Sequence, residues 1–324
     1  MNSPTVRPLI VSTAPIGQIA LDMLREVAEV VTAPSPEENA LLILSKNAIG
    51  IVCRGEGKVS RRVIEACTAL RVIGRPGAGF DSVDIRAATE SGIPVIYAPV
   101  GGFAVAEGAL ALLLALVKKV SLGDALVKSG QWRRRYEVST GDMMGHTLGL
   151  IGVGRIGTHL ARLAQAFDMR ILGYDPFISK EAFSDKTVRL VALEELLARS
   201  DYVSVHVPLT DQTRGLIGKK TIPLMKTGAL LVNTARGQII EDLDVLADAL
   251  DTHHLAGVAL DVFPVEPPDV SHRIFAHPNF LASPHLQGVS DAAMDRIYRS
   301  MAADMVAVLK GERPVYCVNP QVFS

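Results

Sequence analysis

Short apolar runs alternate with stretches of helical periodicity along nearly the whole chain, and this alternation constrains the fold most. The apolar runs are rich in the β-branched residues that strands prefer, and the stretches between them repeat apolar residues at helical spacing. Strand–helix–strand units of this kind form parallel sheets with helices on both faces. The sequence therefore predicts an α/β protein.

The pattern occurs twice, so we expect two Rossmann-like or flavodoxin-like doubly wound parallel sheets, with a cleft between the two domains. Strands are expected at 9–11, 27–31, 49–53, 72–73 and 95–97, and then at 148–153, 170–174, 202–207, 229–233, 256–259 and 280–282. Helices are expected at 16–26, 59–67, 85–91, 155–167, 193–199, 243–250 and 291–310.

Two Pro/Gly-rich stretches, at 98–102 and 284–288, divide the chain. The helical pattern after the second stretch is too short to form a domain, so it should return to the first half. We expect residues 1–99 and 287–324 to form one domain. Residues 100–286 should form the other.

Composition excludes several classes of protein. The formal net charge of −1 offers no electrostatic basis for binding nucleic acid or an anionic membrane surface. The apolar run 108–117 is about half as long as a bilayer requires, and the N-terminus lacks the long apolar region of an export signal. Three scattered cysteines suit reduced thiols. We expect a cytoplasmic enzyme with no metal site.

The strongest motif is the segment GVGRIG at 152–157, which follows an apolar strand and opens a helix. Gly152 permits a tight turn, Gly154 allows the backbone to approach a pyrophosphate, and Gly157 allows close packing of helix on strand. The N–H groups at the start of the helix would bind the phosphates. Asp175 follows the next strand, where a carboxylate accepts hydrogen bonds from the adenosine ribose and repels a 2′-phosphate. NAD is therefore expected rather than NADP.

Polar residues follow three later strands at their carboxyl ends. Arg236 follows the strand at 229–233, Asp261 and Glu266 follow the next, and His285 follows the strand at 280–282. Ligands of parallel α/β sheets bind at that edge. Arg236, Glu266 and His285 therefore each lie just past a strand end, on three successive strands, where the chemistry of the site is expected.

The motifs NTARG at 233–237, ALDVFPVEPP at 259–268 and SPH at 283–285, in this order behind GVGRIG, resemble the NAD-dependent D-isomer-specific 2-hydroxyacid dehydrogenase family. The segments at 53–54 and 72–84 resemble its phosphoglycerate dehydrogenase branch. The resemblance runs from about residue 49 to 311. It implies hydride transfer between NAD(H) and a small D-2-hydroxy or 2-keto acid, possibly 3-phosphoglycerate or hydroxypyruvate/glyoxylate.

The resemblance also implies catalytic roles. His285 is expected to be the general base for the alcohol proton, and the acid in the reverse direction. Glu266 would hydrogen-bond the other imidazole nitrogen, fix its tautomer and stabilise the imidazolium. Arg236 would hold the substrate carboxylate and polarise the C2 oxygen, because a planar guanidinium suits that geometry.

The remaining site residues fall into two expected sets. The cofactor contacts are Gly152, Gly154, Arg155, Ile156, Gly157, Asp175, His206, Thr234 and Asp261, although packing alone explains His206 equally well. The substrate contacts are Arg54, Arg75, Gly77, Ala78 and Gly79; the last three form a turn expected to precede a helix at 82–88.

Several alternatives stay open. A NAD-sensing, corepressor-like binding protein could use the same fold, whereas a formate dehydrogenase is disfavoured because Glu266 stands where that branch has Gln. Arg133, Arg134 and Arg135 either reach a neighbouring active site or form a solvated charge run. The helix at 108–117 is apolar on every face, which predicts complete burial and a homodimer through the NAD domain. The pair His253 and His254 is expected in a solvated turn.

Overall fold

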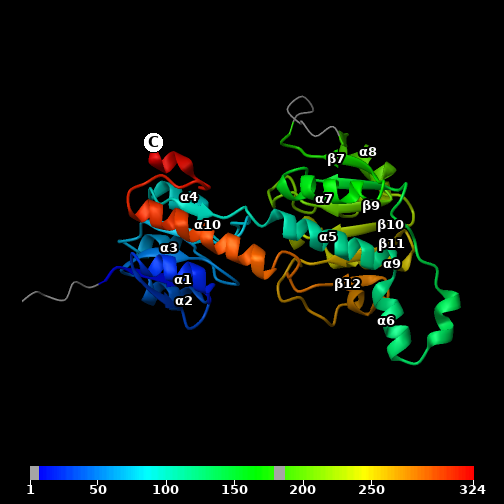
Figure 1. Ribbon diagram of the computed structural model, residues 1–324, viewed down its shortest axis with the longest axis horizontal. Coiled ribbons are helices and arrows are strands. Elements are labelled where there is room, and N and C mark those ends of the chain that lie inside the picture. The colour runs from blue at the N-terminus through cyan, green and yellow to red at the C-terminus, as the bar shows by residue number, and fades with distance from the viewer. Residues whose placement is uncertain (1–6, 179–186) are drawn as a thin grey trace, which may run out of the picture. The chain divides into compact units, whose positions relative to one another are not determined.

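The computed structural model describes residues 7–178 and 187–324 (Figure 1). It divides into two compact units. The first consists of Met1–Gly101 and Ser290–Ser324, and the second of Gly102–Val289. The chain thus passes between units after residues 101 and 289, where the sequence suggested 99 and 286. The first six residues, part of the segment in which no export signal was expected, lie outside the described residues.

The first unit contains, within its described residues, a five-stranded parallel sheet in the order β2-β1-β3-β4-β5. Its strands are β1 (Leu9–Ser12), β2 (Glu29–Thr32), β3 (Ala48–Val52), β4 (Val72–Arg75) and β5 (Val95–Tyr97). Its helices are α1 (Gln18–Arg25), α2 (Glu38–Leu44), α3 (Arg61–Ala66), α4 (Ile85–Glu90) and α10 (Asp291–Leu309), with a 3-10 turn η5 (Pro320–Phe323). This is the flavodoxin-like strand order, in which the direction of winding reverses between β1 and β3.

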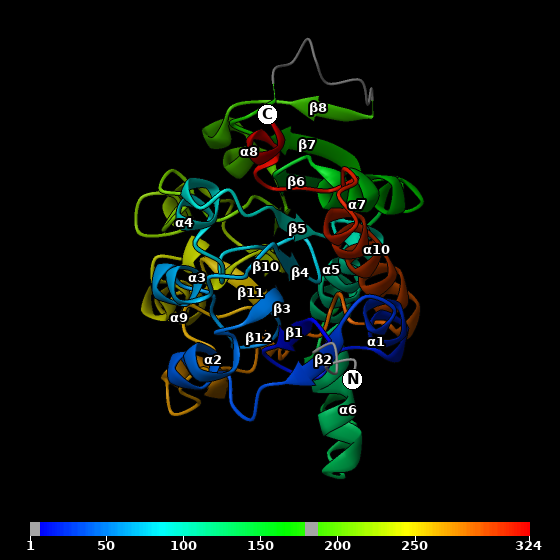
Figure 2. The same cartoon turned by 90° about the vertical axis from the view of Figure 1, so that its left-hand side faces the viewer.

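Helices cover both faces of this sheet. Figure 2 shows α1 and α10 on one side and α2, α3 and α4 on the other. On the α1 and α10 side, the core includes Ile10, Leu24 and Met301, all of which are fully buried. Because the central strands are buried on both faces, they read as continuous apolar runs rather than as an alternating pattern.

The second unit contains a parallel sheet of seven strands among residues 102–178 and 187–289, in the order β12-β11-β10-β9-β6-β7-β8. Its strands are β6 (Thr147–Ile151), β7 (Arg170–Tyr174), β8 (Val188–Leu190), β9 (Tyr202–Val205), β10 (Ala229–Asn233), β11 (Leu255–Leu260) and β12 (Phe280–Ala282). Its helices are α5 (Gly102–Val117), α6 (Val120–Lys128), α7 (Arg155–Gln165), α8 (Leu193–Arg199) and α9 (Leu243–Asp251). The 3-10 turns are η1 (Trp132–Glu137), η2 (Ile222–Leu224), η3 (Gly237–Ile239) and η4 (Arg273–Ala276).

This order is Rossmann-like, with the winding reversed between β6 and β9. Helices α5 and α7 pack together on one face of the sheet, and α8 and α9 cover the other. Helix α6 and the η1 turn extend away from the sheet of their unit (Figure 1). The predicted fold class, two doubly wound parallel α/β sheets, is therefore confirmed.

Of the two starts expected for the same helix, residue 82 was wrong and residue 85 was right. The helix begins at Ile85, because the Asp84 carboxylate caps it by accepting the N–H of Ala87 at 2.8 Å. The turn at 77–79 therefore does not adjoin a helix N-terminus. The segment 108–117 of α5 was expected to be completely buried. Within one chain Ala111 is exposed and Leu110 and Leu114 are half-buried, so complete burial would require a partner.

Within the described residues, no helix is long and apolar enough to span a membrane.

Candidate active site

The glycine-rich turn joins β6 to α7 and is shaped by close backbone contacts. Gly152 has φ of +100°, which a side chain rarely tolerates. A Cβ on Gly157 would lie 2.1 Å from the carbonyl oxygen of Gly152, whereas a Cβ on Gly154 would meet no atom within 4 Å. The turn is therefore tight on its inner side and open above Gly154.

Asp175 lies at the end of β7 beside this turn. One carboxylate oxygen accepts the N–H of Val153 at 3.1 Å, and the other accepts the N–H of Phe177 at 2.9 Å. The first hydrogen bond ties the carboxylate to the backbone of the glycine-rich turn, and the second ties it to the chain just after β7, so together they hold its orientation. The geometry leaves further lone pairs of both oxygens for a ligand.

Two polar side chains at the carboxyl ends of β9 and β10 contain buried atoms without a partner in the described residues: Nδ1 of His206 and Oγ1 of Thr234. The other ring nitrogen of His206 lies 2.8 Å from the hydroxyl of Ser204. Burial lowers the pKa of His206 to about 3, so the ring is neutral near pH 7. Buried polar atoms without partners are rare, and they often mark the place of a ligand or water.

His285 and Glu266 form a hydrogen-bonded pair: Nδ1 of His285 lies 3.1 Å from Oε2 of Glu266. The second oxygen of Glu266 accepts the N–H of Phe263 at 3.0 Å. Burial acts to raise the pKa of Glu266, but the hydrogen bond with His285, the N–H of Phe263 and the charge of Arg236 outweigh it. The pKa of Glu266 therefore lies below its usual value. An ionised Glu266 orients His285 and stabilises its protonated form.

The loop that carries His285 is held by Asp261, which is only 2% exposed. The Asp261 carboxylate accepts the N–H groups of Leu286 at 2.9 Å and Gln287 at 3.2 Å, and its carbonyl accepts the N–H of His285 at 2.8 Å. His285 has φ of +55°, a strained backbone conformation that functional sites often contain. Sequence reasoning assigned Asp261 to the cofactor and missed this positioning role, because no sequence pattern reveals which backbone groups a buried carboxylate will meet.

Arg236 follows β10 in a loop organised by the fully buried Asn233. The Asn233 amide donates to the carbonyl of Arg236 at 2.9 Å and accepts the N–H of Ala235 at 3.0 Å. Nη1 of Arg236 donates to the Ala235 carbonyl at 2.7 Å. The positive charge of Arg236 acts to lower the pKa of Glu266.

The candidate substrate residues of the first unit lie at the carboxyl ends of β3 and β4. The backbone of Arg54 is clamped by Thr13, whose hydroxyl accepts its N–H at 2.8 Å and donates to its carbonyl at 2.6 Å. Arg75 is the last residue of β4, and Gly77, with φ of +119°, turns the chain through the 77–79 segment. Both arginine side chains are half-buried.

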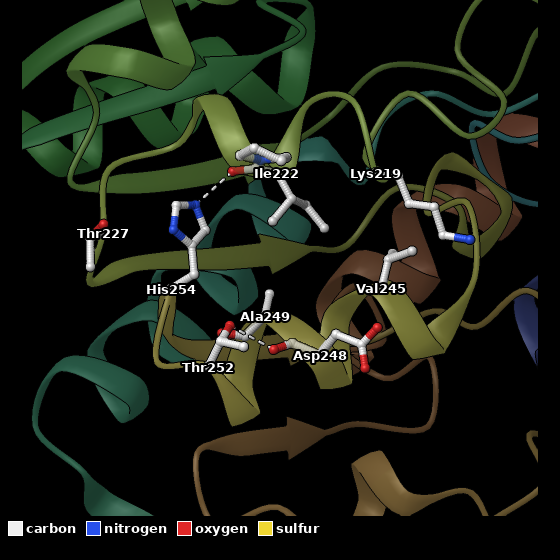
Figure 3. Close-up of a pocket in the computed structure, with 9 residues that line it drawn as sticks. Lys219, Ile222, Thr227, Val245, Asp248, Ala249, Thr252 and His254 are labelled. Carbon is white, nitrogen blue, oxygen red and sulfur yellow. Dashed lines mark hydrogen bonds between the residues drawn. The ribbon is translucent and has the colours of Figure 1, made fainter.

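A separate cavity of about 580 Å³ lies in the second unit between η2 and α9 (Figure 3). The described residues that line it include Lys219, Asp248 and His254, but none of the candidate catalytic residues. The Nε2 atom of His254 lies 2.9 Å from the Ile222 carbonyl. His253 and His254 were expected to form a solvated turn. This was wrong for His254, which contacts η2, whereas His253 is exposed as expected.

Comparison with known proteins identifies the family. Residues 110–287 match the model of the NAD-binding domain of the D-isomer specific 2-hydroxyacid dehydrogenases. A glyoxylate reductase from Thermofilum pendens is 36% identical over 98% of this chain and 96% of its own. The chain belongs to this family.

Two further proteins to which the chain is similar are a phosphoglycerate dehydrogenase and a D-lactate dehydrogenase of known structure. A D-3-phosphoglycerate dehydrogenase from Methanocaldococcus jannaschii is 40% identical over 96% of this chain, which spans 59% of the relative's length. The structure of a D-lactate dehydrogenase from Aquifex aeolicus, complexed with NAD and lactic acid, superposes with a TM-score of 0.86 at 27% identity and covers 96% of this chain and 99% of its own. The phosphoglycerate dehydrogenase-like resemblance is thereby confirmed.

The residues of the second unit fit the dinucleotide that its family binds. The turn is open above Gly154, and the unpartnered Nδ1 of His206 and Oγ1 of Thr234 follow neighbouring strands of the same sheet. Asp175 stands beside the turn, as ribose recognition requires. This unit is the NAD-binding domain of the family.

Proposed function

We propose that this protein transfers a hydride between NAD(H) and a small D-2-hydroxy acid or 2-keto acid. The observation that carries the proposal is the His285–Glu266 pair, with its 3.1 Å hydrogen bond, at the edge of the sheet that also carries the glycine-rich turn. The names of the relatives, a phosphoglycerate dehydrogenase and a glyoxylate reductase among them, support the same reaction class.

In this mechanism His285 removes the proton from the C2 hydroxyl during oxidation and returns it to the C2 oxygen during reduction. Glu266 accepts a hydrogen bond from the other ring nitrogen, so Nε2 of His285 is left to face the substrate. Because Glu266 is ionised, it stabilises the imidazolium that forms when the alcohol loses its proton. Arg236 binds the substrate carboxylate and polarises the C2 oxygen.

NAD bound at this unit would supply the hydride acceptor for the C2 hydrogen. For holding the dinucleotide we propose the turn residues Gly152, Gly154, Arg155, Ile156 and Gly157, together with Asp175, His206, Thr234 and Asp261. The backbone N–H groups at the start of α7 would bind the pyrophosphate. Asp175 accepts hydrogen bonds from the ribose, and its charge disfavours the 2′-phosphate of NADP.

The first unit would be the substrate-binding domain, with Arg54, Arg75 and the turn at Gly77, Ala78 and Gly79 as substrate contacts. Two guanidiniums at adjacent strand ends favour a substrate with a second anionic group beyond its carboxylate. We therefore favour 3-phosphoglycerate and its keto acid over hydroxypyruvate or glyoxylate.

A homodimer through the second unit is part of the proposal. The partly exposed stripe of α5 continues into α6 and η1, where Val120, Val127, Trp132 and Tyr136 are each more than half exposed. Large apolar side chains exposed together favour a partner, and a second copy of the chain would bury these same residues on both chains.

The arginine run in η1 makes local contacts. Arg134 pairs with Glu137 at 3.0 Å, and Arg135 lies over the ring of Trp132 at 4.8 Å. These contacts lie within the turn, so both alternatives for Arg133, Arg134 and Arg135, a neighbouring active site or a solvated charge run, stay open. A cytoplasmic location suits the three unbridged cysteines, Cys53, Cys67 and Cys317.

The test is NADH oxidation, followed at 340 nm, with phosphohydroxypyruvate, hydroxypyruvate, glyoxylate and bulkier 2-keto acids. Turnover of at least one supports the proposal. Tight NADH binding without turnover of any of them would favour the corepressor-like binding protein. Size-exclusion chromatography with light scattering tests the dimer, and a monomer at micromolar concentration contradicts that part of the proposal.

A further inference from the structure

The switch point of the first unit lies between β1 and β3, where the direction of winding reverses. Ligands of open parallel sheets bind outside the carboxyl ends of the strands at this point. Pro15 and Gly17 lie in the connection that follows β1, and Arg54 lies just after β3. The side chain of Tyr298, from α10, reaches the same place, since a Cβ on Gly17 would lie 2.7 Å from its ring.

Tyr298 is almost fully buried, with 4% of its surface exposed, and it supports Arg54. The Arg54 guanidinium lies over the phenol ring, 5.6 Å from its centroid, and Nη1 donates to the carbonyl of Pro15. The ring and this carbonyl hold the guanidinium on two sides. An arginine held in this way loses less conformational entropy when it binds an anion.

The Tyr298 hydroxyl itself makes no hydrogen bond to any described residue, although it is buried. Burial raises the pKa of this phenol, while the charge of Arg54, the backbone N–H of Gly17 and the charge of Arg75 act to lower it. Each of these neighbours is a positive charge or a hydrogen-bond donor. The partner that this group lacks is therefore an acceptor, and the surrounding charge favours an anionic one.

We propose that the Tyr298 hydroxyl is a specificity determinant of the substrate site and donates a hydrogen bond to a phosphate group carried by the substrate between Arg54 and Arg75. The inference rests on the proposed hydride-transfer function and adds to it the residue that distinguishes a phosphorylated 2-keto acid from its unphosphorylated counterpart. A neutral hydroxyl suits this role, since it completes the coordination of a phosphate oxygen without adding a third charge.

The test compares Tyr298→Phe with the wild type on phosphohydroxypyruvate and hydroxypyruvate, which differ only in the phosphate. The variant keeps the ring under Arg54 and loses only the hydroxyl. We expect KM for phosphohydroxypyruvate to rise roughly tenfold, the effect of one hydrogen bond to a charged group. The KM for hydroxypyruvate and both kcat values should stay within twofold.

Tyr202→Phe is the matched control. Tyr202 lies in the second unit and is also buried, and its hydroxyl donates to the carbonyl of Asp142 of the same unit. It should leave the ratio of the two KM values unchanged. An unchanged ratio in Tyr298→Phe, or an equal rise for both substrates, would overturn the assignment of Tyr298. A larger effect of Tyr298→Phe on a keto acid with a second carboxylate than on the phosphorylated substrate would also overturn it.

A binding measurement separates this inference from the proposed reaction. Isothermal titration with 3-phosphoglycerate and with D-glycerate requires no turnover. Weaker binding of 3-phosphoglycerate alone by Tyr298→Phe supports the phosphate site even if no keto acid is reduced. Equal affinities of wild type and variant for 3-phosphoglycerate refute it even if the enzyme is active.

Discussion

The neutral His206 makes the stability of the second unit depend on pH in a predictable way. Its pKa is about 3 in the folded protein because of burial, against about 6.5 in an unfolded chain. Above pH 6.5 the ring is neutral in both states, so it contributes no pH dependence. Below pH 6.5 the histidine of the unfolded state becomes protonated, whereas that of the folded state stays neutral down to about pH 3. The free energy of unfolding therefore falls as the pH falls.

The expected loss follows from that difference. Between pH 7 and pH 5 the histidine of the unfolded chain passes from largely neutral to largely protonated. One pKa unit corresponds to about 1.4 kcal/mol, so the free energy of unfolding falls by about 2 kcal/mol over this interval. His206→Gln removes the titrating ring and keeps a polar group able to reach Ser204. Between pH 7 and pH 5 the free energy of unfolding of the variant should therefore fall by about 2 kcal/mol less than that of the wild type.

Urea unfolding at pH 7 and pH 5, followed by the fluorescence of Trp132, measures this difference. Trp132 is the only tryptophan in the chain and belongs to the same unit as His206. His253→Gln, at an exposed position of that unit, is the control and should follow the wild type. If wild type and His206→Gln lose equal stability between the two pH values, the buried neutral state assigned to His206 is refuted.

Three further predictions concern the proposed reaction. His285→Ala should lower kcat by roughly 10²–10⁴-fold while NADH still binds, as stopped-flow and fluorescence titration would show; near-normal turnover would exclude His285 as the acid–base residue. Glu266→Gln removes the charge that stabilises the imidazolium, so kcat should fall roughly tenfold or more, and an unchanged kcat would contradict the pairing. Asp175→Ala removes the repulsion of a 2′-phosphate, so the ratio of kcat/KM for NADH to that for NADPH should fall roughly tenfold or more, and an unchanged ratio would contradict the role of Asp175.

Elements with a strong local signal could be predicted from the sequence. The strands at 170–174, 229–233 and 280–282 and the helix at 193–199 have the observed bounds, because each apolar run ends at a polar residue, Gly or Pro. The edge strand β8 and the helix α2 were missed. Strand β8 is three residues long with an arginine at its centre, and the short α2 leaves Ile43 79% exposed, so neither shows a clear period.

The candidate site could likewise be predicted only in part from the sequence. Residue types and spacings along the chain pointed to the glycine-rich turn, to Asp175 and to the polar residues at three strand ends, because parallel strands bring their carboxyl ends to one edge. These are local signals, and a single sequence contains them. The sequence by itself thus determined the fold class, the family and the chemical types of the groups at the site.

Only the tertiary structure decided which groups touch. It showed that Asp261 holds the His285 loop, that Nδ1 of His206 is buried without a partner in the described residues, and that Tyr298 lies beneath Arg54, more than 240 positions away in the numbering. Burial and hydrogen-bond geometry arise from packing between segments that are distant in sequence, and a pattern within one segment cannot encode the distance to another. The charge state of a histidine and the missing partner of a phenol therefore appear only after the chain is folded.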